Sequence, residues 1–194
     1  MNYIINSLNK FADKRNLEDL TNVPLLSINN DTIQKHIDKL KNINGTRILF
    51  GGDTIFGIVH EKYGFIEPTL IYIPLKEIMK KENFDIVTTE IFGPVQIITD
   101  YSEIDDVIDC INRIKHKLTA GIVSDNQRFI DYVTGKTTNG TTYTGMNART
   151  TGAPQNHWFG PGGDPRGGSL GTPEAIRHVW AYHRVVTSDI GEYK

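Results

Sequence analysis

Residues 94–124 read PVQIITDYSEIDDVIDCINRIKHKLTAGIVS, and this stretch decides the fold class of the chain. It begins with an apolar run typical of a strand, continues with a helical pattern from Ser102, and ends in a second apolar run. Acids precede bases along the helical part, as the helix dipole favours. Its apolar residues recur at the 3.6-residue helical period: Ile104, Val107, Ile108, Ile111, Ile114 and Leu118. A strand, a helix and a strand in this order predict parallel strands joined by a crossover helix.

The segments on either side continue the same alternation. Strands are predicted at residues 46–52, 65–73, 94–101, 119–124 (buried) and 139–146. Further helices are predicted at residues 31–43, around 129–133, and from Thr172 as N-cap with Pro173 at the first helical position. The alternation predicts an α/β fold in which helices cover a mainly parallel, twisted sheet, and one domain is the simplest organisation.

Two positions in the first half of the chain refine these predictions. In residues 31–43, Ile33, Ile37 and Leu40 share one helix face, and we expect Asn30 or Asp31 to be the N-cap. Proline cannot donate to a strand ladder, so Pro68 within residues 65–73 indicates an edge or strand-entry position.

The first residues, MNYIINSLNKFADKR, are amphipathic and basic, which leaves two interpretations. A mitochondrial presequence is poor in acids and rich in arginine, whereas this stretch contains Asp13 and runs into the acidic NLEDL. Ile4, Ile5, Leu8 and Phe11 keep helical spacing. We therefore favour an ordinary packed helix.

The composition argues against several classes of protein. The 194 residues carry a formal net charge of -2, which argues against a dedicated nucleic-acid binder. No apolar run approaches the roughly 20 residues of a membrane helix, so we expect no membrane association. The single cysteine rules out an intramolecular disulfide and favours a reducing compartment.

Two stretches are candidates for chemistry. In TTEIFGPVQIITDY, residues 88–101, Glu90 and Phe92 are either part of an ordinary loop or a ligand edge that combines an acceptor with a flat apolar face. The glycine-rich FGPGGDPRGG, residues 159–168, is no dinucleotide fingerprint, because its prolines prevent a helix from starting there. Its aromatic neighbours argue for an ordered loop that lines a pocket.

Residue types alone predict no complete catalytic set. Cys110 lies inside the predicted helix beside Asp109, away from the helix N-terminus that reactive cysteines prefer, which indicates a half-buried packing residue. His178 and His183 are five residues apart, so a helix does not place both imidazoles on one face. We predict no metal site.

Several stretches resemble known enzymes. GFIEPTLIYIP followed by TTEIFGPVQIITDY resembles paired motifs in the catalytic domain of aldehyde dehydrogenases. More specifically, LNKFADKRNLEDL, NGTTYTG, ARTTGAPQNHWFGPGGDPRG and GTPEAIRHVWAYHR resemble plant- and protist-type Δ1-pyrroline-5-carboxylate dehydrogenases, over residues 8–191. That family oxidises glutamate semialdehyde to glutamate with NAD in proline breakdown.

The resemblance assigns roles to six residues. The glutamate that matches Glu90 accepts hydrogen bonds from the nicotinamide ribose, and the phenylalanine that matches Phe92 lies against the nicotinamide, presented from the end of a strand where ligands of open α/β sheets bind. The match of Thr151, Gly152 and Ala153 to the substrate-anchor loop implies that they hold the substrate carboxylate, with Ala153 replacing a serine hydroxyl. Phe159 matches an aromatic wall of the aldehyde pocket.

The resemblance also implies what this chain does not contain. The family's nucleophilic cysteine, general-base glutamate, oxyanion-stabilising asparagine and NAD-binding domain all precede the segment that matches Met1, and Cys110 does not replace the nucleophile. We therefore expect residues 1–183 to be part of the catalytic domain, with no catalytic residue in this chain and no dehydrogenase activity alone. The tail, residues 184–194, resembles an extended oligomerisation strand, which implies a homo-oligomer.

Three hypotheses remain at this point. The first, which we favour, is the C-terminal part of a mitochondrial NAD-dependent Δ1-pyrroline-5-carboxylate dehydrogenase; the location follows from the family, since no targeting segment is visible in this chain. The second is a stand-alone, non-catalytic module that pairs with a full-length subunit. The third is an unrelated binding protein, which binding to RNA at physiological salt would favour.

Overall fold

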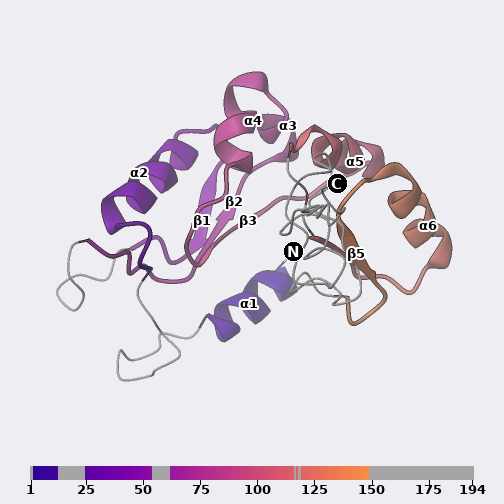
Figure 1. The fold of residues 1–194 in the computed structure, drawn as a ribbon, viewed down its shortest axis with the longest axis horizontal. Helices are drawn as coiled ribbons and strands as arrows, with labels where there is room; N and C mark the ends of the chain where they lie inside the picture. Colours follow the sequence, from indigo (N-terminus) through magenta and orange to yellow (C-terminus); the bar gives the residue numbers. More distant parts are fainter. Residues whose placement is uncertain (1, 13–24, 54–61, 116, 118, 149–194) are drawn as a thin grey trace, which may run out of the picture. The chain divides into compact units, whose positions relative to one another are not determined.

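The computed structural model describes residues 2–12, 25–53, 62–115, 117 and 119–148 (Figure 1). The chain forms two compact units, Met1–Val107 and Ile108–Lys194, and each contains a sheet of its own. Within the described ranges, no helix is long and apolar enough to cross a membrane.

The first unit is built on a three-stranded sheet of order β1-β2-β3. β2 (Thr69–Tyr72) lies in the centre, antiparallel to β1 (Arg47–Phe50) and parallel to β3 (Val95–Ile98). Parallel strands need a long connection, and two helices supply it here: α3 (Leu75–Ile78) and α4 (Lys81–Thr88). This is a strand–helix–strand unit of the predicted kind.

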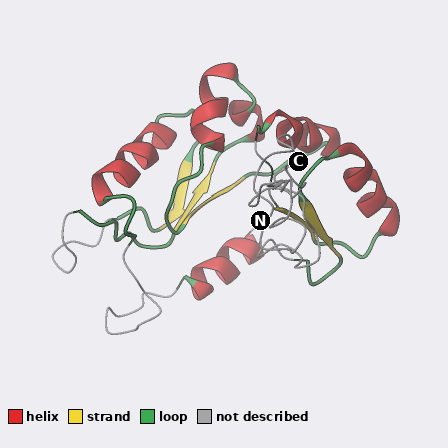
Figure 2. Ribbon diagram, in the orientation of Figure 1, coloured by secondary structure: helices red, strands yellow, loops and turns green. Residues whose placement is uncertain are grey.

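The second unit repeats this connection on a smaller scale. β4 (Thr119–Ile122) and β5 (Thr141–Thr144) are parallel, and α6 (Gln127–Lys136) joins them (Figure 2). Helix α5 (Ile104–Arg113) crosses the boundary between the units. Two parallel strand pairs with helical crossovers confirm the predicted α/β class. The strands on either side of α5 are in different sheets, however, so the crossover predicted for residues 94–124 does not join paired strands in the described residues.

The core of the first unit forms where helix α2 (Asn30–Lys41) packs. Ile33, Ile37 and Leu40 of α2 are all 0% exposed, which confirms the predicted apolar face. His36 on the same helix donates from Nε2 to the carbonyl oxygen of Ile86 in α4 at 2.8 Å. Figure 1 shows α2 and α4 beside the three strands, with helix α1 (Asn2–Phe11) separate from both.

Two elements begin at other residues than predicted, because hydrogen bonds to the backbone determine where each one starts. The ladder of β2 begins directly after Pro68, which has no N–H to donate, so this proline marks a strand entry and residues 65–68 lie outside the strand. The N-cap of α2 is Asn29, one residue before the predicted positions, because its side chain accepts from the backbone N–H of Thr32.

The helix predicted from Ser102 to Leu118 is shorter in the structure. Helix α5 begins at Ile104 and ends at Arg113, where Ile114 N–H donates to the carbonyl oxygen of Ile111 in a tighter last turn. Ile108 is its one buried residue. Apolar periodicity identifies which face of a helix is apolar, but it does not determine how deeply that face is buried.

Two elements are less deeply buried than predicted. Helix α1 forms as predicted, with Ile5 and Leu8 half-buried, but none of its residues is fully buried. Strand β4 was expected to be buried, yet its Gly121 is exposed and Ile122 is its one buried residue. The predicted helix from Thr172 and the tail at residues 184–194 lie outside the described residues.

Candidate functional site

The loop that carries Glu90 and Phe92 lies between α4 and β3. Helix α4 ends at Thr88, and the next residue, Thr89, is already extended. Both the N–H and the hydroxyl of Thr89 donate to the carbonyl oxygen of Asp85, at 3.0 and 2.6 Å. These bonds satisfy a carbonyl that the helix end would leave free, and they direct the chain out of the helix toward Glu90.

Two tight turns and one bond to the sheet then hold the loop. Gly93 N–H donates to the carbonyl oxygen of Ile91, and Val95 N–H donates to that of Gly93, both at 2.8 Å. Three-residue turns of this kind are common where strands meet loops. The carbonyl oxygen of Pro94 accepts from the N–H of Thr69 at 2.8 Å, which attaches the loop to the first residue of β2.

The side chains of the two candidate residues are open to solvent while this backbone is held. Phe92 is 60% exposed, although apolar rings of this size are usually covered. Glu90 is exposed, and in the part of the chain that the structure describes its carboxylate has no hydrogen-bond or ion-pair partner. An acceptor without a partner and an uncovered ring, two residues apart on a held loop, fit a ligand that has hydroxyl donors and a flat face.

This loop lies at a different edge of the sheet from the one expected. It precedes β3, so it is at the amino ends of the parallel strands β2 and β3, whereas ligands of open α/β sheets usually bind at carboxyl ends. The antiparallel strand β1 ends at this same edge, and the chain leaves it through Gly51 and Gly52. Gly52 N–H donates to the Thr69 hydroxyl at 2.9 Å, so the β1 end and the Glu90 loop share an anchor in Thr69.

The carboxyl ends of β2 and β3 border a cavity of about 620 Å³ that the sequence analysis did not single out. Tyr72, Lys76, Asp100, Tyr101 and Asp106 are among its lining residues. Asp100 and Ser102, two and four residues after the end of β3, are the sequence signal that could have found it, because ligands often bind at the carboxyl ends of parallel strands.

A hydrogen-bonded tyrosine–aspartate pair lines this cavity. The Tyr72 hydroxyl donates to Asp100 Oδ1 at 2.8 Å, and the Arg47 guanidinium lies 4.5 Å from the centre of the Tyr72 ring. The bond to Asp100 raises the pKa of Tyr72 above its ordinary value, since it stabilises the neutral phenol, and Arg47 opposes this to a smaller extent.

Cys110, the one cysteine of the chain, is a half-buried free thiol in α5, as predicted. Burial raises the pKa of this thiol, and the positive charge of Arg113 offsets part of the rise. A raised pKa lowers the thiolate fraction at neutral pH, which is the opposite of what a nucleophile requires.

The four residues expected to bind substrate, Thr151, Gly152, Ala153 and Phe159, lie outside the described residues. Their roles therefore stay predictions. The described part brings Glu90 and Phe92 together on one loop and adds Thr69, a buried residue that sequence reasoning missed. Its backbone N–H holds the loop through Pro94, and its hydroxyl holds the end of β1 through Gly52.

The fold of the chain corresponds to a known class of α/β enzymes. The model of the aldehyde dehydrogenase family matches residues 8–182, and the chain belongs to that family. It is 48% identical over 97% of its length to a probable aldehyde dehydrogenase of Linum usitatissimum, covering 35% of that protein. It is 45% identical over 97% of its length to the mitochondrial Δ1-pyrroline-5-carboxylate dehydrogenase 12A1 of Arabidopsis thaliana, covering 34% of it.

Solved structures agree with this assignment. An aldehyde dehydrogenase point mutant from Bacillus cereus matches with a TM-score of 0.58 and 25% identity, over 79% of this chain and 30% of that chain. Succinic semialdehyde dehydrogenase from Streptococcus pyogenes, solved with NADP+ as the cofactor, matches with a TM-score of 0.51 and 26% identity, over 68% and 26%. The chain thus spans about a third of the length of the curated relatives it matches.

Proposed function

We propose that this chain is the C-terminal catalytic-domain part of an NAD-dependent Δ1-pyrroline-5-carboxylate dehydrogenase of proline breakdown. The substrate would be glutamate semialdehyde, and the enzyme would be a mitochondrial homo-oligomer. The similarity to the A. thaliana enzyme supports the substrate class and the location. The NADP+ complex of the S. pyogenes relative supports a nicotinamide cofactor, and we propose NAD.

The observation that carries this proposal is the held loop with Glu90 and Phe92 uncovered. When bound, NAD would accept the hydride of the aldehyde while water supplies the second oxygen of the carboxylate product. Glu90 would accept hydrogen bonds from the ribose hydroxyls, because a carboxylate is purely an acceptor and each hydroxyl is a donor. Phe92 would lie against the nicotinamide ring and limit its position. Thr151, Gly152 and Ala153 would hold the substrate carboxylate, and Phe159 would form a wall of the aldehyde pocket.

On this proposal the isolated chain has no activity, because no residue in it serves as nucleophile or general base. The test is to capture the native protein from its source cells with an antibody raised against this chain, and then to measure its mass and its NAD-dependent oxidation of pyrroline-5-carboxylate. We expect a polypeptide far larger than 21.8 kDa that reduces NAD. A captured protein of 21.8 kDa without activity would instead support a non-catalytic module that pairs with a full-length subunit.

The role of the loop is tested in the polypeptide that carries the activity. Glu90→Gln should raise the KM for NAD about tenfold, the loss expected for a charge-assisted hydrogen bond, and leave the KM for the aldehyde unchanged. Phe92→Leu should lower kcat by loosening the position of the nicotinamide. Glu103→Gln, at an exposed acid outside this loop, is the matched control and should change neither value.

A further inference from the structure

The cavity at the carboxyl ends of β2 and β3 is a second candidate site, distinct from the Glu90 loop. Its volume of about 620 Å³ is within the range of about 300–1,000 Å³ that is usual for small-molecule pockets. The Glu90 loop lies at the amino ends of the same two strands, and in the described part of the chain none of its residues lines the cavity. Binding in the cavity can therefore be examined separately from any binding at the loop.

Side chains of both charges line this cavity without neutralising each other. Lys76 and Asp106 are exposed, and among the described residues neither has a hydrogen-bond or ion-pair partner. Asp100 accepts one hydrogen bond, from the Tyr72 hydroxyl. A carboxylate offers about four acceptor sites, so Asp100 can accept further hydrogen bonds. The cavity thus offers an ammonium donor and two carboxylate acceptors to a ligand.

Apolar side chains form the rest of the lining. Pro74, Leu75 and Met79 line the cavity and are half-buried. The ring of Tyr101, which also lines the cavity, is 52% exposed. Small-molecule sites commonly combine apolar side chains with a few polar groups that orient the ligand. These residues give the cavity an apolar surface beside its charged groups.

We propose that this cavity binds a free α-amino acid with a short apolar side chain. The ammonium group of the amino acid would donate to Asp106 and Asp100, and its carboxylate would accept from Lys76. Its side chain would lie against Leu75 and Met79. A zwitterion fits this set of groups better than a simple cation or anion, because either of those would leave one charge of the cavity unpaired. The inference concerns binding alone and does not rest on the proposed function.

Three probes that share a carbon skeleton test the charge requirement. They are L-norvaline, butylamine, which lacks the carboxylate, and pentanoate, which lacks the ammonium group. Each is titrated into the isotope-labelled 194-residue chain, and binding is followed by the NMR shifts of the backbone amides. We expect norvaline to cause saturable shifts at Tyr72, Lys76 and Tyr101. Its dissociation constant should be about three- to fivefold lower than that of either analogue, because solvent-exposed charge contacts are individually weak.

Substitutions test which residues bind which group. Lys76→Gln and Asp106→Asn should each weaken norvaline binding about three- to fivefold. Lys76→Gln should leave the affinity for butylamine unchanged, because butylamine lacks the carboxylate that Lys76 would bind.

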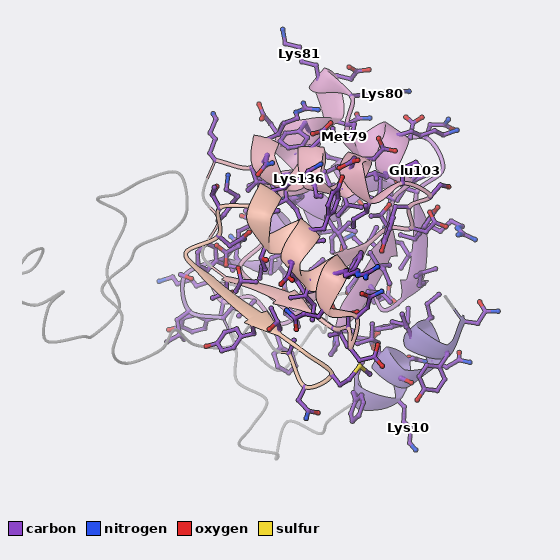
Figure 3. All side chains as sticks on the ribbon, turned by 90° about the vertical axis from the view of Figure 1, so that its right-hand side faces the viewer. Lys10, Met79, Lys80, Lys81, Glu103 and Lys136 are labelled. Atoms are coloured by element: carbon purple, nitrogen blue, oxygen red, sulfur yellow. The ribbon has the colours of Figure 1, made fainter. Side chains whose placement is uncertain are left out.

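The matched controls are Lys81→Gln and Glu103→Gln, at exposed residues that do not line the cavity. Lys81 extends outward from the ribbon (Figure 3). Both controls should leave norvaline binding unchanged. All four substitutions are at exposed positions, so each variant should keep the circular dichroism spectrum and unfolding midpoint of the parent chain.

Three results would overturn the inference. They are an absence of saturable shifts with norvaline, an analogue that binds as tightly as norvaline, and a control variant that weakens binding as much as Lys76→Gln or Asp106→Asn. None of these results bears on the dehydrogenase proposal, since that proposal is decided by the mass and activity of the captured native protein.

Discussion

Gly51 occupies a backbone position that no other residue accommodates without strain. Its φ angle is +71°, and a Cβ built there would lie 2.2 Å from the carbonyl oxygen of Pro68. The neighbouring Gly52 has a φ of +100° and donates to the Thr69 hydroxyl. The glycine pair therefore lets β1 end in close contact with the start of β2, at the edge where the Glu90 loop is anchored.

We predict that Gly51→Ala lowers the free energy of unfolding by about 2–4 kcal/mol, because the methyl group meets a backbone atom and the φ angle is unfavourable for alanine. Gly135→Ala is the matched control. Gly135 lies inside α6 with open space around a built Cβ, so alanine there should stabilise by about 0.5–1 kcal/mol. Urea denaturation followed by circular dichroism measures both, and equal signs would contradict the argument.

The Tyr72–Asp100 hydrogen bond makes a prediction about pH. The folded-state pKa of Tyr72 is raised above its ordinary value of 10.0, so this bond contributes its full stability below pH 10 and loses it as the pH rises through the folded-state pKa. Asp100→Asn should move the pKa of Tyr72 back toward its ordinary value. Absorbance titration of the tyrosines at alkaline pH, compared with Asp106→Asn as a control in the same cavity, measures the shift. An unchanged titration in Asp100→Asn would disprove the cause.

Capping decides where the elements begin. The Asn29 side-chain oxygen accepts from both the N–H and the hydroxyl of Thr32, at 3.0 and 2.7 Å. Asn30, one of the two caps expected from sequence, instead uses its side chain to accept from the N–H of Phe65, 35 residues away. Of these two adjacent asparagines, Asn29 therefore caps the helix and Asn30 makes a long-range hydrogen bond. Sequence spacing by itself did not distinguish these two roles.

We predict that Asn29→Ala destabilises the first unit by about 1 kcal/mol, the usual cost of losing an N-cap. Asp31→Ala, at the other expected cap, should cost only the weaker interaction with the helix dipole, about 0.3–1 kcal/mol at low salt and less as salt rises. Thermal unfolding at two salt concentrations separates the two effects. A larger loss of stability for Asp31→Ala than for Asn29→Ala would indicate that Asp31 is the N-cap, as one of the sequence-based predictions had it.

Across the whole molecule, the stability of the first unit depends on the central strand and the α2 face. Ile71 and Ile73 on the β2 segment and Ile33, Ile37 and Leu40 on α2 are all 0% exposed. This burial supports the strands whose amino ends hold the Glu90 loop. Helix α1, in contrast, contributes no fully buried residue to this core.

We predict that Ile71→Ala lowers the unfolding free energy by about 2–5 kcal/mol, as expected for truncating a fully buried aliphatic side chain. Ile4→Ala removes the same atoms from an exposed position and should change it by less than about 0.5 kcal/mol. Chemical denaturation of both variants beside the parent chain provides the comparison. If Ile4→Ala cost as much as Ile71→Ala, the Ile4 side chain would be buried in solution.

The sequence by itself determined the alternation of strands and helices, the apolar face of α2, and the motif that places Glu90 and Phe92 together. Each of these is local, because periodicity, turn residues and motif spacing act within about 15 neighbouring positions. The tertiary structure alone decided which sheet edge carries the Glu90 loop, which asparagine caps α2, and which amphipathic helix contributes no fully buried residue. Those outcomes depend on contacts between residues far apart in the chain, such as Pro94 with Thr69 and Asn30 with Phe65, and no local pattern encodes them.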